Sequence, residues 1–467
     1  MAPAWLPPLA LIAMRFIISN KFFDMRKTTF LFLVIFILIM GVRAQDSVQV
    51  RRYLQDLCAP AMHGRGYAYN GDGIAAGYIR DQFKRMQIAP FKYSDYFERY
   101  GFTVYSMEGL VSAELNGNPL ELWTEFAFAP YSRSADAEYN MLPIDPEVLV
   151  NRNTLKEFCL KNRKQLDNCL LYVDMTQCED QNLRKKVDEM CRYLHVWNGE
   201  YAFKGLVLGV KEIPVWSFAF AKSRCDYILC YVKSELAKKK NNKIKLLCTN
   251  ELKFHNTQNV CAFIPGTEVP DSIVVIGAHY DHLGQMGAEI MFPGCHDNAS
   301  GTATMLDMAR YFKEHPLRYT TVFVAFSGEE AGMMGSHFFV RDSLFDFSKV
   351  KLVLNLDLLC GGDDGFMVVN SQADNTKGFY DALLELNKQM NKRKGGVKEI
   401  KSRPNAANSD HYPFTTKGMP AVFVYTLGGK TGGYHAPSDT PENASLKQYH
   451  RIVSLLIKGV EKVCGGR

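Results

Sequence analysis

The chain has 467 residues, of which 22% are charged and 47% are hydrophobic. This balance is typical of a folded globular protein and excludes both a disordered chain and a protein embedded wholly in a membrane. The net charge is +6, but residues 1–44 alone hold +4 of it, so the rest of the chain is nearly neutral and carries no general attraction for nucleic acid.

The first predicted element is a signal peptide. Met25 is followed by a short basic segment, by an uncharged run over residues 30–42 and by small residues around Ala44, which are the three parts of a secretory signal. The run is shorter than the ~20 apolar residues that cross a membrane. We therefore expect residues 1–44 to be an N-terminal extension plus signal, with the start at Met25 and cleavage near Ala44. The product would be exported, periplasmic or secreted, with no stable membrane anchor; an uncleaved anchor is the alternative.

The twelve cysteines include no CxxC pair, which excludes a zinc ribbon and a thioredoxin-like site. Export permits disulfides. We expect mostly buried thiols with one or two bridges, such as one between Cys225 and Cys230.

Residues 45–101 are predicted to form the first part of the main domain. Apolar residues recur at helical spacing from Val50 to Leu57 and from Ile74 to Met86, so each stretch predicts an amphipathic helix. Between them, residues 63–67 (His-Gly-Arg-Gly-Tyr) predict a tight turn, because their glycines lack the strand and the third glycine of a nucleotide-binding loop.

Residues 102–247 differ in pattern from the segments on either side. Short alternating runs predict strands at residues 110–115, 170–173, 205–210 and 215–220. We interpret this region as a β-rich insertion in the main domain.

From residue 248 to the end, apolar strands alternate with helices. The strands are expected at residues 272–278, 320–326, 351–357, 366–370 and 421–425, and the helices at 300–312, 332–340, 376–391 and 445–463. This alternation predicts a largely parallel sheet with helices on both faces. The predicted fold class is therefore α/β, a mostly parallel mixed sheet sandwiched by helices, with the β-rich insertion.

Acids and histidines stand where these strands end or helices begin. They are His279, Asp297, Glu329, Glu330, Asp357 and His435. The carboxyl ends of parallel strands meet at one edge of a sheet, and imidazole combined with carboxylate suits Zn²⁺. The set exceeds what one tetrahedral ion needs, so two ions that share a carboxylate fit better. Asp281 lies two residues after His279 and would face the same way, placed to accept the free N–H of that imidazole.

Six short motifs contain these residues in order. They are Ala278-His279-Tyr280-Asp281-His282-Leu283-Gly284, His296-Asp297-Asn298-Ala299-Ser300-Gly301, Ala325-Phe326-Ser327-Gly328-Glu329-Glu330, Asn355-Leu356-Asp357, Ser409-Asp410-His411 and Tyr434-His435. Together they resemble the co-catalytic di-zinc aminopeptidases of clan MH, which are related to bacterial leucyl aminopeptidase and glutamate carboxypeptidase. The resemblance runs from about Asn259 to the end of the chain.

The resemblance implies a role for each residue. It assigns one zinc ion to His279 and Asp357, the other to Glu330 and His435, the bridge between them to Asp297, and the general base to Glu329. It thereby implies an exported metallo-aminopeptidase with two Zn²⁺ per chain and a peptide as substrate, in which Asp281 supports catalysis. His296 stands where the family often has an acid, but this is not a ligand position.

The same family often carries an inserted protease-associated (PA) domain. Residues 102–247 resemble one, with Glu212-Ile213-Pro214-Val215 similar to a later strand of that module. Three alternatives stay open: a mono-zinc glutaminyl-peptide cyclotransferase, a carboxypeptidase of the same family, and a non-catalytic receptor-like module. The complete ligand set favours the aminopeptidase. Other hydrolases fit poorly, because the chain has neither a GxSxG elbow nor an HExxH helix.

Overall fold

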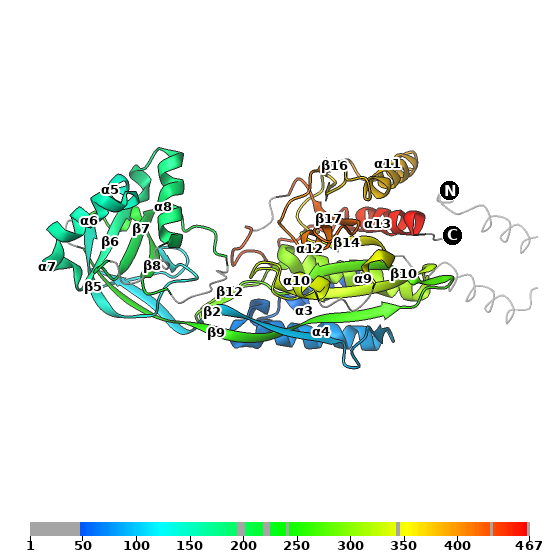
Figure 1. Ribbon diagram of the computed structural model, residues 1–467, viewed down its shortest axis with the longest axis horizontal. Coiled ribbons are helices and arrows are strands. Elements are labelled where there is room, and N and C mark those ends of the chain that lie inside the picture. Colours follow the sequence, from blue (N-terminus) through cyan, green and yellow to red (C-terminus); the bar gives the residue numbers. More distant parts are fainter. Residues whose placement is uncertain are drawn as a thin grey trace, which may run out of the picture. The chain divides into compact units, whose positions relative to one another are not determined.

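The computed structural model describes residues 47–193, 201–217, 225–239, 242–341, 346–429 and 433–464 (Figure 1). The predicted signal peptide and its cleavage site lie outside these residues. Within the described residues, no helix combines the length and the apolar character that a membrane span requires.

A mostly parallel sheet forms the centre of the main half of the protein. Its strands lie in the order β16 (Ile400–Arg403), β15 (Phe366–Val369), β17 (Ala421–Thr426), β14 (Val350–Leu356), β10 (Val269–His279), β13 (Tyr319–Phe326) and β9 (Lys243–Ile264). β10 is parallel to both of its neighbours and β14 is parallel to β17, whereas β15 and β9 run antiparallel to β17 and β13. The predicted α/β fold is confirmed.

Helices cover both faces of this sheet. They are α3 (Ser47–Leu57), α4 (Gly71–Arg85), α9 (Ser300–Glu314), α10 (Met334–Arg341), α11 (Lys377–Asn391), α12 (His411–Thr415) and α13 (Tyr449–Val463). Successive residues of β10 enter opposite cores, as the two-residue period of a strand requires. Val274 and Ile276 pack in the core that includes α9 and α13, while Ile273 and Val275 pack in the core that includes α10 and α12.

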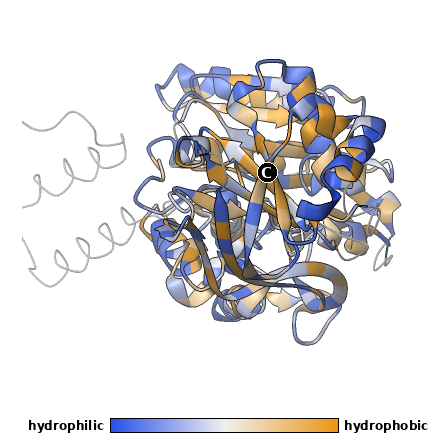
Figure 2. Ribbon diagram, turned by 90° about the vertical axis from the view of Figure 1, so that its left-hand side faces the viewer, coloured by the Kyte–Doolittle hydropathy of each residue, from blue (hydrophilic) through white to orange (hydrophobic). Residues whose placement is uncertain are grey.

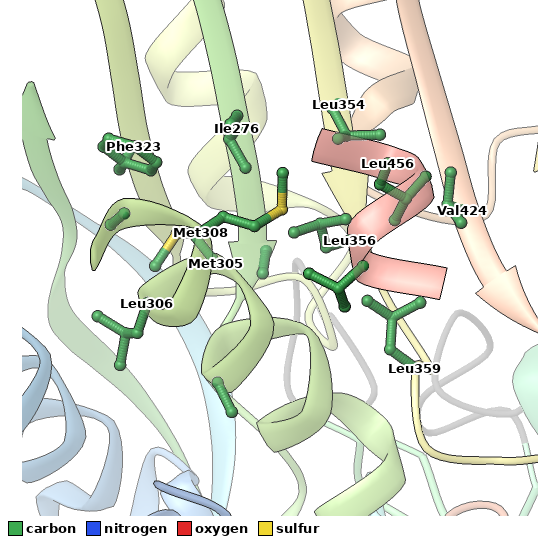
Figure 3. Packing of buried hydrophobic residues seen from close by; sticks show 14 of the residues in the cluster. Ile276, Met305, Leu306, Met308, Phe323, Leu354, Leu356, Leu359, Val424 and Leu456 are labelled. Carbon is green, nitrogen blue, oxygen red and sulfur yellow. The ribbon is translucent and has the colours of Figure 1, made fainter. Parts of the chain in front are cut away.

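The larger core lies between the sheet and α9. Met305, Leu306 and Met308 of α9 lie close to Ile276 and Phe323 of the sheet, and Leu456 of α13 lies beside Leu354 and Val424 (Figure 3). All of these side chains are buried. This packing holds the carboxyl ends of the central strands in fixed positions.

A second group of strands and helices, the β4–β8 segment, extends from the other end of β9. Its elements are β4 (Phe126–Phe128), β5 (Ala135–Pro143), α5 (Pro146–Val150), α6 (Arg152–Lys161), α7 (Arg163–Leu166), β6 (Cys169–Asp174), α8 (Gln181–Tyr193), β7 (Gly205–Val210) and β8 (Ile228–Lys233). Shorter elements are β1 (Ala89–Pro90), β3 (Asn118–Leu120), β11 (Gly284–Met286), β12 (Ile290–Phe292) and 3₁₀ turns at Pro60–Arg65, Ala68–Asn70, Met175–Gln177, Ser234–Leu236 and Phe347–Lys349.

Two long antiparallel strands belong to both groups. β2 (Phe97–Leu115) pairs with β9 from Phe97 opposite Val260 to Leu115 opposite Ile244, with one irregularity between Glu108 and Ser112. One end of β9 pairs with β13 and the other with β5. Buried and more exposed residues alternate over much of β2 and β9, and Figure 2 shows strands along which hydrophobic and hydrophilic residues alternate; a strand with this pattern turns one face toward a core.

The structure differs from three expectations for residues 102–247. Helices α5 to α8 were not predicted, so the region is less purely β than expected. Residues 215–217 of the expected strand 215–220 form no strand, and they follow Pro214, which has no amide proton for a ladder; residues 218–220 lie outside the described chain. Cys225 and Cys230 are both free thiols, because they pack in different cores.

Candidate metal centre

Three neighbouring strands bring predicted ligands to one edge of the main sheet. His279 is the last residue of β10, and the strand register pairs it with Phe326, the last residue of β13. Asp357 follows directly after the end of β14, on the other side of β10. The sequence therefore places these side chains close together through parallel strand pairing alone.

Turns at the same edge supply the remaining predicted ligands. Asp297 lies in the turn Cys295–Ala299 that leads into α9, and Glu329 and Glu330 lie in the turn after β13. His435 lies in the connection between β17 and α13. The side chains of Asp297 and His435 are buried.

Two groups of possible ligands share Asp297. In the first group, Nε2 of His279 lies 3.3 Å from Asp297 Oδ1 and 3.3 Å from Asp357 Oδ1. In the second group, Nε2 of His435 lies 3.0 Å from Asp297 Oδ2 and 3.3 Å from Glu330 Oε2. The two carboxylate oxygens of Asp297 thus face two different histidines, which is the arrangement that a bridging carboxylate needs.

His282 is a fourth member of the second group and was not predicted as a site residue. Its Nδ1 lies 2.7 Å from Glu330 Oε1. The only sequence signal was its place in the same motif as His279, three residues further on. Glu329 belongs to neither group, although its carboxylate interacts electrostatically with those of Glu330 and Asp357.

Asp281 supports the turn that carries both glutamates. Its Oδ1 accepts a hydrogen bond from the amide of Glu329 at 3.2 Å, and its Oδ2 accepts from the amide of Glu330 at 3.3 Å and from the hydroxyl of Tyr67 at 2.6 Å. The distance from Asp281 Oδ1 to Nδ1 of His279 is 3.7 Å, and that nitrogen lies nearer, at 3.2 Å, to the backbone carbonyl of Asp281. Asp281 therefore contacts the turn of Glu329 and Glu330 through its side chain and the imidazole of His279 through its backbone carbonyl.

Asp357 is oriented by the Ser409-Asp410-His411 motif. Ser409 Oγ donates to Asp357 Oδ2 at 2.7 Å and accepts from Asn355 Nδ2 at 2.7 Å. Asp357 Oδ1 is buried and, within the described residues, makes no hydrogen bond. Ser409 thus fixes Oδ2 of this carboxylate, while Oδ1 faces Nε2 of His279 and remains available as a metal ligand.

His435 is oriented by a residue distant in the sequence. Its Nδ1 lies 2.9 Å from the backbone carbonyl of Trp216. A carbonyl only accepts, so Nδ1 is the donor and Nε2 is the nitrogen that faces Asp297 and Glu330. Trp216 is itself held by a bond from its indole N–H to the carbonyl of Phe128, at 3.1 Å, and by stacking on Phe292.

The carboxylates and histidines shift one another's pKa values. Burial raises the pKa of Glu329 well above its usual range, and the charges of Asp410, Glu330 and Asp357 add to this effect. Burial alone would lower the pKa of His435, but Glu330 and Asp297 raise it to about 9. Several acids in one buried place cannot all be ionised without positive charge nearby. Protonated imidazoles or a divalent cation would supply that charge.

The comparisons with known proteins agree with this geometry. Residues 259–460 match peptidase family M28. The matched segment is called the M28 half below. The sequence resemblance to zinc aminopeptidases is thereby confirmed.

Relatives of the M28 half carry names of peptidases. A "probable leucine aminopeptidase" of Arthroderma otae is 29% identical over 207 residues, which are 42% of this chain and 55% of that protein. "Aminopeptidase YwaD" of Bacillus subtilis is 28% identical over 196 residues, 41% of each chain, and a "probable glutamate carboxypeptidase VP8" of Zea mays is 30% identical over 40% of this chain and 27% of that protein. The chain spans about half or less of the length of these relatives.

Solved structures share the fold over nearly the whole chain. A zinc aminopeptidase from Bacillus subtilis superposes with a TM-score of 0.65 over 89% of this chain and 95% of that one, at 16% identity. An aminopeptidase from an Aneurinibacillus strain gives 0.59 over 90% and 94%, also at 16% identity. These values extend the fold beyond the M28 half, to β2 and much of the β4–β8 segment.

Proposed function

We propose that this chain is an exported zinc-dependent aminopeptidase, which releases single residues from the amino terminus of peptides. The observation that carries the proposal is the pair of ligand groups that share Asp297. The family match and the peptidase names of its relatives support it.

The residues at the site fit two zinc ions. His279, Asp297 and Asp357 would hold one ion, and Asp297, Glu330 and His435 the other, with His282 beside Glu330. Imidazole with carboxylate is a donor set for zinc rather than for magnesium or calcium. The buried Oδ1 of Asp357 also lacks a hydrogen bond among the described residues, as an oxygen aimed at a cation would.

Glu329 would act as the general base, because it adjoins both ligand groups and belongs to neither. When bound, the zinc ions would supply Lewis acidity, which lowers the pKa of water and polarises a carbonyl group. The Glu329 carboxylate would accept the proton of the attacking water and then give it to the nitrogen of the leaving amine. Burial raises the pKa of Glu329, which favours uptake of the proton from water, whereas a nearby dication would lower the pKa and favour release of that proton to the amine.

An amine terminus suits the charge of this site better than a carboxylate terminus. Four acidic side chains lie at this site, and they attract an ammonium group. They are the buried Asp297 and Asp357 and the half-buried Glu329 and Glu330. A carboxypeptidase would need a cluster of cations. Four basic residues of the M28 half are candidates for such a cluster. Lys401, Arg403 and Lys417 are all exposed, and Lys430 lies outside the described residues.

Two assays test this function. Elemental analysis of the purified chain should give about two zinc ions, and a chelator should abolish hydrolysis; one ion at saturation would favour the mono-zinc cyclotransferase. One peptide should then be offered in free, N-acetylated and C-amidated forms. Cleavage of the free and amidated forms only is expected, and equal cleavage of the acetylated form would rule out an aminopeptidase.

Export and the domain division are also proposals. N-terminal sequencing of the secreted protein should begin near Gln45, and a product that still contains residue 30 would contradict cleavage there. The topology supports a division into residues 45–101, a PA-like insertion at 102–247 and residues 248–467. In the chain, β2 connects the main sheet to the β4–β8 segment, and β9 connects that segment back to the main sheet.

A further inference from the structure

Arg65 is a buried cation that the proposed chemistry does not use. It ends the 3₁₀ turn Pro60–Arg65, has a positive φ of 51° and is fully buried. Arginine is almost never fully buried unless its charge is partnered. Yet within the described residues no carboxylate lies at ion-pair distance from its guanidinium, so its burial needs another explanation.

The guanidinium donates only to backbone carbonyl groups. The contacts are Nε to Tyr280 O at 2.7 Å, Nη1 to Leu57 O at 2.9 Å and to Pro293 O at 2.6 Å, and Nη2 to Gly294 O at 2.6 Å and to Asp297 O at 3.5 Å. In return, the carbonyl of Arg65 accepts from the amide of His282 at 3.2 Å. A rigid fork of donors thus binds several buried carbonyl groups, of which that of Gly294 also accepts from the amide of Ala299 at 3.1 Å.

Four of these five carbonyl groups, all except that of Leu57 at the end of α3, belong to the two backbone segments that carry ligands of the first ion. Tyr280 stands between His279 and Asp281, at the end of β10. Pro293 and Gly294 lead into the turn that carries Asp297. The adjoining strands β11 and β12 pair Gly284 with Phe292, and the guanidinium adds a second link between the two segments, directly at the backbone behind His279 and the backbone behind Asp297.

We propose that Arg65 is a positioning residue of the metal centre. It fixes the end of β10 against residues 293–297, which keeps Nε2 of His279 and Oδ1 of Asp297 at the 3.3 Å separation that one shared ion requires. Arg65 touches neither substrate nor metal. The proposal rests on the proposed zinc site, and it adds a function for the turn at residues 63–67.

The test is a zinc titration of the full chain against a competing chelator, for wild type, Arg65→Lys and Arg65→Gln. Lysine keeps the charge but cannot reach carbonyl groups in three directions, and glutamine keeps one amide donor. Both variants should bind at least one of the two zinc ions ~10- to 100-fold more weakly, as when other supports of metal ligands are removed, and kcat should fall with zinc occupancy while KM changes little. Excess zinc should restore kcat.

Leu456→Ala is the matched control. Leu456 is a fully buried residue of α13 in the same core, so its truncation lowers the melting temperature without altering the links of Arg65. It should keep wild-type zinc affinity in the folded protein. Wild-type affinity in both Arg65 variants, or an equal loss of affinity in Leu456→Ala, would overturn the role of Arg65 alone. A wild-type chain that binds no zinc would overturn the proposed function as well.

Discussion

His435 and Trp216 are 219 residues apart in the sequence and are joined by a 2.9 Å hydrogen bond from the imidazole to the tryptophan carbonyl. A proposed ligand in the M28 half is therefore oriented by a residue of the region predicted as an insertion. The ring of Trp216 stacks on Phe292 at 5.1 Å between centroids, which fixes the path of the backbone whose carbonyl is used.

We expect Trp216→Ala to weaken zinc binding by ~10-fold, because the carbonyl that orients the His435 imidazole loses its anchor. Trp123→Ala is the control, since Trp123 also packs on Phe292, at 5.0 Å, but edge-on, and within the described residues it makes no hydrogen bond with His435. Calorimetric zinc titration of the two variants measures the difference. Equal affinity in both would show that the Trp216 contact does not matter for the metal.

Glu329→Gln should keep the metal and slow turnover by ~10² to 10⁴, which is the usual contribution of a positioned general base. Glu330→Gln should lose zinc, because Glu330 Oε2 lies 3.3 Å from Nε2 of His435. Zinc content and kcat of both variants are to be measured together. If Glu329→Gln were the variant that lost zinc, the roles of the two glutamates would be exchanged.

Asp281→Asn should weaken zinc binding by ~10- to 100-fold and should also lower kcat in the zinc-saturated protein. The second effect is expected because the amide nitrogen of asparagine replaces one of the two carboxylate oxygens and cannot accept, so one of the two bonds from the amides of Glu329 and Glu330 is lost. Tyr67→Phe removes only the third partner of the carboxylate and should have a smaller effect. A larger effect of Tyr67→Phe would contradict this ranking.

Ser409→Ala should lower zinc affinity by ~10-fold, since Asp357 Oδ2 would lose its donor. Ser371→Ala provides a comparison, because Ser371 is equally buried and its hydroxyl makes no hydrogen bond among the described residues. Chelator competition would separate the two variants. Identical affinities would indicate that Ser409 serves packing only.

His411 should make the protein less stable in acid. Burial lowers its pKa from 6.5 to about 4, so the unfolded chain takes up a proton before the folded one does. This contribution is complete above pH ~6.5 and is lost as the pH falls to about 4, up to roughly 3 kcal/mol in all. Burial also raises the pKa of the neighbouring Asp410 to about 7, and that shift acts in the opposite direction, destabilising the fold as the pH rises.

The difference between wild type and His411→Gln isolates this histidine, because Asp410 is common to both chains. Urea unfolding at intervals from pH 4 to 7 should show a flatter acid limb for the variant, while glutamine can still bond to Asn405, the present partner of His411. Parallel curves for the two proteins would mean that the pKa of His411 is not lowered in the folded state.

The sequence was sufficient for the parts of the site that depend on local pattern. His279 and Asp357 were predicted because apolar strands stop at them, and parallel strands end at a common edge. Arg65 and Trp216 were not predicted as site residues, because their contacts join segments far apart and involve backbone carbonyl groups, which leave no signature in a side-chain pattern. His282 was not predicted as a site residue, because nothing in the sequence pattern beyond its place in the motif of His279 marks it as a ligand.

The β4–β8 segment was predicted less well for a different reason. In α8 the buried residues Val187, Met190 and Cys191 stand at helical spacing, but they are few and lie among charged residues. The apolar face of α8 is therefore narrow, and its helical periodicity is a weaker signal than the apolar runs that predict the neighbouring short strands. Helices of this kind depend on tertiary packing for most of their stability.

The continuous pairing of β2 with β9 has a consequence for unfolding. The ladder runs from one group of strands into the other, so unfolding of either group breaks pairing that both share, and the two groups should unfold in a coupled manner. The weak point is the irregularity between Glu108 and Ser112, where Leu110 is 58% exposed. A protease that cuts there would leave two fragments that stay bound to each other through β9, and they would separate only in denaturant.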